Sequence, residues 1–185
     1  MYRNWWLQQS NGLRALAVLG CALAAGLLGP IAIDLPGETP ITLQTMLILL
    51  PSLLFGWEVG VLSAMLYLVA GGMGAPVFAH FTYGWDRFFG STGGYLLAFP
   101  VAALLCGWWA PQGERFRFLR SSLILLAGQI LILCLGMVWQ RNIVPPSDTV
   151  WEALDHLIPG LVIKTAVGTL LLTGIARVVD RVSRG

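Results

Sequence analysis

The chain has 185 residues, of which 57% are hydrophobic and only 11% are charged. Ordinary soluble proteins carry roughly a quarter charged residues, so this chain could not cover a surface that faces water. Its net charge of +2 gives no support to nucleic-acid binding, and its length leaves no room for a separate soluble catalytic domain. The composition predicts an all-α membrane protein in contact with membrane lipid.

Six apolar segments are long enough to cross the hydrocarbon core, which takes roughly 17 to 25 helical residues. In chain order they are residues 13–33, 40–56, 57–77, 90–110, 120–140 and 158–179. The first is longer than the apolar region of a secretory signal peptide, so we expect it to be retained. This predicts a cytoplasmic N-terminal segment (1–12), a six-helix transmembrane domain (13–179) and a cytoplasmic C-terminal tail (180–185).

The distribution of Lys and Arg predicts the orientation. Eight of the 11 fall on the side of the termini, Arg87 and Arg141 fall on the other side, and Lys164 lies within a span. Because positive charges stay in cytoplasmic loops during insertion, both termini are expected in the cytoplasm. We therefore expect a multi-pass protein of the plasma membrane, as in a prokaryotic inner membrane. Segments 78–89 and 141–157 would then face outward, and both are long enough to be candidate lids.

The first span contains pairs of small residues at four-residue spacing, Gly20 with Ala24 and Ala22 with Gly26. Small residues at this spacing let another helix approach closely. They could pack within the same bundle or form a docking face for a separate membrane subunit, and the sequence leaves both open.

No motif for enzyme chemistry is found. The glycine-rich run 90–94 resembles a phosphate-binding loop but lacks the lysine that follows one. The three cysteines, Cys21, Cys106 and Cys134, fall in different apolar runs without metal-ligand spacing. We therefore predict a protein that is not an enzyme and uses no cofactor and no metal.

Lys164 is the only lysine, about six residues into the last predicted span. A lysine at the centre of a membrane helix costs roughly 2.5 to 3.5 kcal/mol. It could extend to the outer interface, with its ammonium in water. Alternatively it faces a cavity and pairs with an anionic group, which the stripe Gly160, Lys164 and Gly168 favours because small residues point toward protein.

Two intramembrane glutamines are also ambiguous. Gln44 lies near the outer mouth of the second span, where its amide suits a neutral cyclic urea, and Gln129 lies in the middle of the fifth. Either could instead make an interhelical hydrogen bond, worth about 0.6 kcal/mol.

Four blocks of sequence, residues 39–46, 66–78, 90–97 and 159–164, resemble in order and spacing the signature blocks of the BioY family. These are the biotin-specific S components of energy-coupling factor (ECF) importers. The resemblance implies a six-helix S component that captures biotin from the outer side. Its partners would be a transmembrane coupling subunit and cytoplasmic ATPases. The small residues Gly20, Ala22, Ala24 and Gly26 would dock the coupling subunit.

The resemblance also implies a ligand site. Lys164 and Gln44 lie at matched motif positions, and biotin's carboxylate, ureido ring and alkyl chain call for a cation, polar groups and apolar walls. Further candidates are Arg87 for the charge, His80 and Asp86 for the polar ring, and Tyr67, Tyr83, Trp85 and Tyr95 for the walls. Leu161 stands where the family usually has an aspartate. An S component for another vitamin, or a structural membrane protein without a ligand, therefore stays open.

Overall fold

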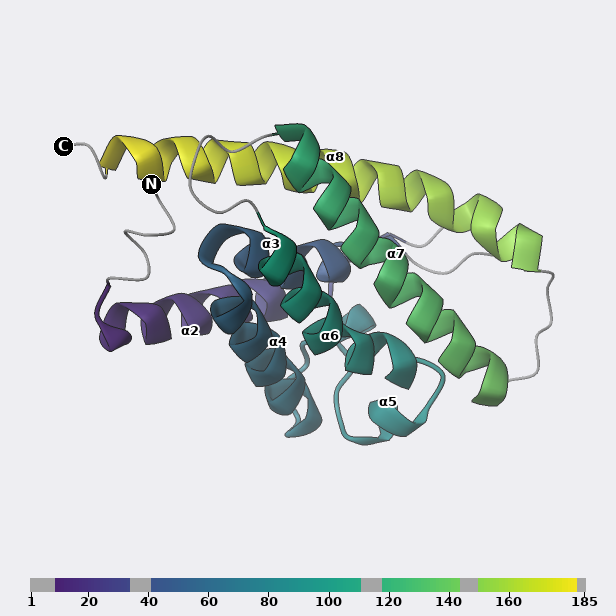
Figure 1. Cartoon of the computed structure of the whole chain (residues 1–185). Coiled ribbons are helices and arrows are strands. Elements are labelled where there is room, and N and C mark those ends of the chain that lie inside the picture. The colour runs from purple at the N-terminus through teal and green to yellow at the C-terminus, as the bar shows by residue number, and fades with distance from the viewer. Residues whose placement is uncertain (1–8, 34–40, 111–117, 144–149, 183–185) are drawn as a thin grey trace.

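The computed structural model describes residues 9–33, 41–110, 118–143 and 150–182, and its backbone there is almost entirely helical (Figure 1). The α-helices are α2 (Asn11–Leu28), α3 (Gln44–Phe55), α4 (Trp57–Gly72), α5 (Asp86–Phe89), α6 (Gly93–Trp109), α7 (Phe118–Ile143) and α8 (Val150–Val182). A 3-10 turn, η1 (Ala79–Phe81), precedes α5, and the short strands β1 (Ala32–Ile33) and β2 (Ile41–Thr42) pair antiparallel. The predicted all-α class is confirmed.

Six of these helices, all except α5, correspond to the six predicted spans. Only α2 and α7 are both long and apolar enough to cross a membrane by length and composition, among the described residues. The apolar helices α3 and α4, α6 and residues 160–175 of α8 are shorter. The helix of the second span, α3, begins later than predicted because residues 41–42 form β2 and pair with β1. The helix of the third span, α4, ends earlier than predicted, before Gly74 takes a left-handed backbone conformation (φ 111°). Six membrane crossings therefore stay a prediction.

The second candidate lid is shorter than expected. Within residues 141–157, α7 continues to Ile143 and α8 begins at Val150, while residues 144–149 lie outside the described part. The first candidate lid, 78–89, consists of η1, α5 and the loop between them.

The long helices run between two ends of the bundle. At one end, the indole Nε1 of Trp139 donates to the Gly90 carbonyl (3.0 Å), and the backbone N–H of His80 donates to the Pro30 carbonyl (3.3 Å). At the other end, Arg14 and Glu58 form a salt bridge. The start of α2 and the end of α8 lie at the same end, as an even number of crossings requires (Figure 1).

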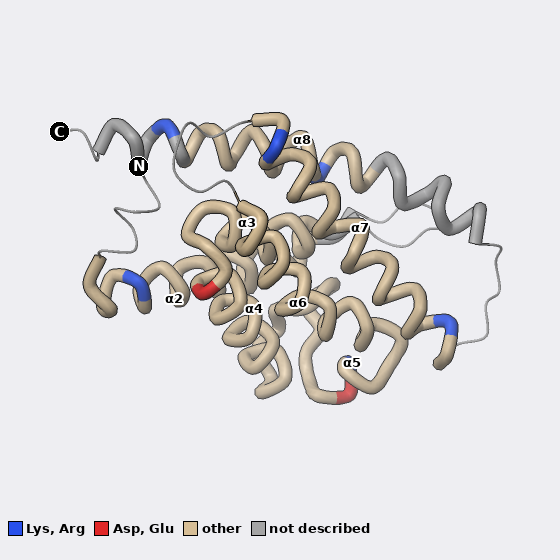
Figure 2. The backbone as a smooth tube through the Cα atoms, in the orientation of Figure 1, with Lys and Arg blue, Asp and Glu red and all other residues tan. Residues whose placement is uncertain are grey.

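Apolar side chains fill the interior and also cover the outside. Buried residues of α3, α4, α6 and α7 form the core, including Leu49, Tyr67, Phe99 and Leu125. Large hydrophobic side chains are nevertheless exposed along α2, α7 and α8, whereas the charged residues are few and lie mostly near helix ends (Figure 2). Apolar surface of this extent is typical of helices that face lipid.

Candidate ligand-binding site

At one end of the bundle, aromatic rings pack directly against glycines that have no side chain to keep them apart. Phe78 lies directly on Gly71, and a Cβ at Gly72 would come 2.8 Å from the ring of Trp85. Trp139 and Tyr95 lie in the same way on Gly94 and Gly136. A methyl group at any of these glycines would overlap a ring. The glycines of α4 thus let the segment that follows it pack on its end, and Gly94 and Gly136 let α6 and α7 approach each other closely.

Gln44 and Tyr67 meet in the core. The amide Nε2 of Gln44 donates to the Tyr67 hydroxyl, which in turn donates to the Val77 carbonyl (2.8 Å). Only 1% of Tyr67 is exposed, and its ring packs edge-on against Phe78 with the centroids 5.7 Å apart. The hydroxyl proton is already used and the ring is covered by protein. This packing favours a structural role for the pair, between α3 and α4, over a wall of the ligand site.

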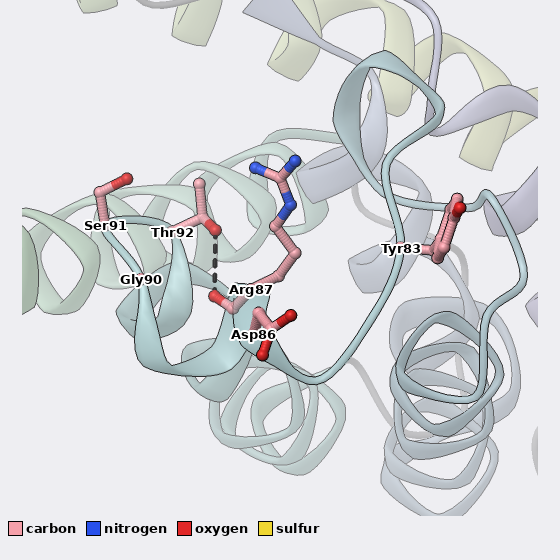
Figure 3. Close-up of a pocket in the computed structure, with 6 residues that line it drawn as sticks. All are labelled: Tyr83, Asp86, Arg87, Gly90, Ser91 and Thr92. Atoms are coloured by element: carbon pink, nitrogen blue, oxygen red, sulfur yellow. Dashed lines mark hydrogen bonds between the residues drawn. The ribbon is translucent and has the colours of Figure 1, made fainter.

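Asp86, Arg87 and Tyr83 surround an open depression of about 290 Å³ (Figure 3). Gly90, Ser91 and Thr92 complete its lining, and the Thr92 hydroxyl donates to the Arg87 carbonyl (3.1 Å). The four-residue helix α5 turns the chain back, so that segment 90–92 faces the loop before it. The sequence did not predict that Ser91 and Thr92 line a site. The run 90–94 lacks the lysine of a phosphate-binding loop, so these residues were not assigned a binding role.

Tyr95 and His80 lie at the same end but take no part in lining this depression. The Tyr95 hydroxyl donates to Oε1 of Gln140 (3.2 Å), which joins α6 to α7. His80 is exposed, with a left-handed backbone (φ 56°) in η1. The structure therefore distributes the predicted residues over several places around one end of the bundle.

Lys164 faces the interior. Its side chain is only 8% exposed, and Gly160 and Gly168 on the same stripe are buried, whereas the preceding residue, Ile163, is exposed. A Cβ at Gly168 would come 2.6 Å from Leu125 of α7 and 2.9 Å from Met46 of α3. The predicted orientation toward protein is confirmed.

Nothing among the described residues forms a hydrogen bond or a salt bridge with the Lys164 ammonium. A lysine side chain with so little exposure is unfavourable in a low-dielectric interior unless its ammonium meets an anionic group. An anionic group that entered the bundle here would relieve this cost. Leu161, one turn earlier, offers only its carbonyl, which accepts from the Thr165 hydroxyl (2.8 Å). Asp155, the nearest carboxylate upstream of Leu161 and a possible substitute for the aspartate usual there, has its side chain outside the described part.

The small residues of α2 fall on two different faces. Ala22 is buried, and a Cβ at Gly26 would come 3.0 Å from Val77 of the bundle. Gly20 and Ala24 are exposed, and no atom lies within 4 Å of the position of a Cβ at Gly20. The two alternatives left open by the sequence therefore apply to different pairs. Ala22 and Gly26 pack inside, and Gly20 and Ala24 stay available on the surface.

Comparisons with known proteins agree on one family. The model of a family described as "BioY family" matches residues 7–181. The "Probable biotin transporter BioY" of Pyrococcus horikoshii is 33% identical over 73% of this chain and 79% of its own length. The "Biotin transporter BioY2" of Lactococcus lactis is 36% identical over 68% of each. A crystal structure described as the S-component for biotin from an ECF-type ABC transporter shares the fold, with a TM-score of 0.74, 22% identity and coverage of 91% and 95%.

Proposed function

The chain belongs to the BioY family, and we propose that it is the membrane-embedded substrate-binding subunit of a biotin uptake system. The names of its relatives support biotin as the ligand, and the shared fold supports the role of an S component. In this function the chain binds and releases the vitamin and catalyses no reaction.

The buried position of Lys164 is the observation on which the ligand assignment depends most. Biotin is an anion at neutral pH, and its carboxylate is a group that can pair with the ammonium of an inward-facing lysine. The stripe that carries Lys164 faces the other helices. Capture of the carboxylate therefore explains why this fold tolerates a charge in an apolar helix.

The two ends of the bundle would face opposite sides of the membrane and bind different partners. The end with Asp86, Arg87 and the open depression faces outward and receives biotin. The end with Arg14 and Glu58 faces the cytoplasm, together with both termini, in the plasma membrane. Gly20 and Ala24 on the open face of α2 dock the ECF coupling subunit, and cytoplasmic ATPases supply the energy.

Equilibrium binding to the purified protein tests this function. Lys164→Ala should weaken biotin binding at least tenfold, or about 1.4 kcal/mol. Arg177→Ala is the matched control, because Arg177 is an exposed cation on the same helix, and it should leave the affinity unchanged. Biotin methyl ester, which lacks the negative charge, should bind the wild type and Lys164→Ala with similar affinity.

Two results would contradict the proposal. Equal biotin affinity in the wild type and Lys164→Ala would remove the role of the lysine. Sub-micromolar binding of another vitamin, with no binding of biotin, would assign the chain to a different substrate. A vitamin panel is warranted because Leu161 is an apolar residue at the position where an aspartate is usual in the family.

A further inference from the structure

Gln129 differs from Gln44 in one respect, because only the Gln129 Oε1 is both fully buried and without a partner among the described residues. It lies about 16 Å from the start of α7 and is only 1% exposed. Its Nε2 donates to the Thr165 hydroxyl on α8 (3.0 Å), but its Oε1 has no hydrogen-bond partner among the described residues.

The orientation of this amide is fixed by Thr165. The Thr165 hydroxyl has a single proton, which it donates to the Leu161 carbonyl (2.8 Å). Toward Gln129 the hydroxyl therefore acts as an acceptor, and the amide must present its NH₂ group. The carbonyl oxygen of Gln129 consequently points away from Thr165 and finds no partner in the described part of the chain.

Gln129 lies at the junction of three helices. It is bonded to Thr165, next to Lys164, and one turn along α7 Leu125 packs against Gly168 of α8. Gly168 also contacts Met46 of α3. The neighbour of Met46, Thr45, is 9% exposed, and its hydroxyl likewise has no partner in the described part.

An unpaired buried carbonyl costs about 1–3 kcal/mol, and in a membrane no water from the bilayer core can compensate it. Gln129 offers an acceptor, whereas the neighbouring Lys164 offers only donors. A ligand that satisfies both must combine an N–H group with an anion. Biotin has this combination, since its ureido ring carries two N–H groups and its side chain ends in a carboxylate.

We propose that Gln129 is a specificity-determining residue of this binding site, whose Oε1 accepts a hydrogen bond from a ureido N–H of biotin. Thr165 positions the amide, and Lys164 receives the carboxylate. Gln44, whose amide is bonded to Tyr67 in the core, does not perform this task. The inference rests on the proposed function.

The test compares two ligands on matched variants. Biotin is compared with 5-(2-thienyl)pentanoic acid, which keeps the carboxylate and a sulfur ring but lacks the ureido group. Gln129→Leu should lose at least tenfold in affinity for biotin and less than twofold for the thienyl acid. Thr165→Val should show the same selectivity with a smaller loss. Thr169→Val is the control, because Thr169 is even more buried than Thr165, and its hydroxyl donates to the Thr165 carbonyl (2.7 Å) and makes no contact with Gln129 among the hydrogen bonds of the described residues.

The outcomes separate the inference from the function. If Lys164→Ala loses biotin but Gln129→Leu binds it within twofold of the wild type, the inference is wrong and the proposed function stands. A parallel loss of both ligands in Gln129→Leu also overturns the inference, because it indicates a packing defect. If the wild type does not bind biotin, the proposed function itself fails. Should Gln129→Leu not fold, Gln129→Met replaces it, since it keeps the length of the side chain without the amide.

Discussion

The contact between α6 and α4 allows a quantitative prediction about stability. Gly107, near the end of α6, lies against the first residue of α4, and a Cβ there would come 2.5 Å from the backbone nitrogen and 2.7 Å from the Cβ of Trp57. Ordinary contacts of a Cβ lie at 3.4–4 Å. Because the obstacle includes backbone, no side-chain rotation can relieve the overlap in Gly107→Ala, and the two helices must move apart.

Overpacking of this kind costs up to about 3 kcal/mol, and the better helix propensity of alanine offsets about 1 kcal/mol of it. A net loss of about 2 kcal/mol lowers the Tm of a chain of this size by about 4–8 °C. Gly174→Ala on α8 is the matched control, because no atom lies within 4 Å of its Cβ position. Its Tm should stay the same or rise.

Thermal unfolding in detergent, followed by circular dichroism, measures both variants under the same conditions. A fall in Tm for Gly107→Ala alone supports the close approach of α4 and α6. If both variants unfold at the temperature of the wild type, the two helices do not meet at Gly107, and the reasoning fails.

Two further predictions concern orientation and docking. Both cysteine substitutions for the first are made in a variant without the three native cysteines. Trp85→Cys should react with a membrane-impermeant maleimide added to whole cells, whereas Glu58→Cys should react only after the membrane is permeabilised. The reverse pattern would place the termini outside the cell. Gly20→Trp, on the open face of α2, should reduce biotin uptake in cells at least fivefold without changing biotin affinity, whereas Leu123→Trp on the exposed face of α7 should leave both unchanged. Normal uptake by Gly20→Trp would exclude this face as the docking surface.

Several features of the site could be predicted from the sequence because they depend on local periodicity. The spacing of Gly160, Lys164 and Gly168 places them on one side of a helix, and the structure confirms that this side is buried. The apolar segments likewise predict the helices, although their ends differ where β2 forms and where Gly74 takes a left-handed conformation. These predictions need no knowledge of which helices are neighbours.

Partners that are distant in sequence could not be predicted. Gln44 and Gln129 look alike as polar residues within apolar segments. The Gln44 amide is nevertheless bonded to Tyr67, whereas the Gln129 amide is bonded to Thr165 and its buried Oε1 has no partner among the described residues. Likewise, helical spacing alone does not say which pair of small residues in α2 faces the bundle. These differences depend on which helix lies opposite, and a periodic pattern contains no information about that.

By itself, the sequence determined that this chain is a helical membrane protein with one costly interior lysine, because hydrophobicity and charge are properties of the residues alone. Its motif blocks also indicated the family. Only the tertiary structure decided which polar groups are already paired and which are not. It set Gln44 and Tyr67 in the core, and near the meeting point of α3, α7 and α8 it left the Lys164 ammonium and the Gln129 Oε1 with no partner among the described residues. The physical reason is that hydrogen bonds form only between groups that packing brings within about 3 Å of each other.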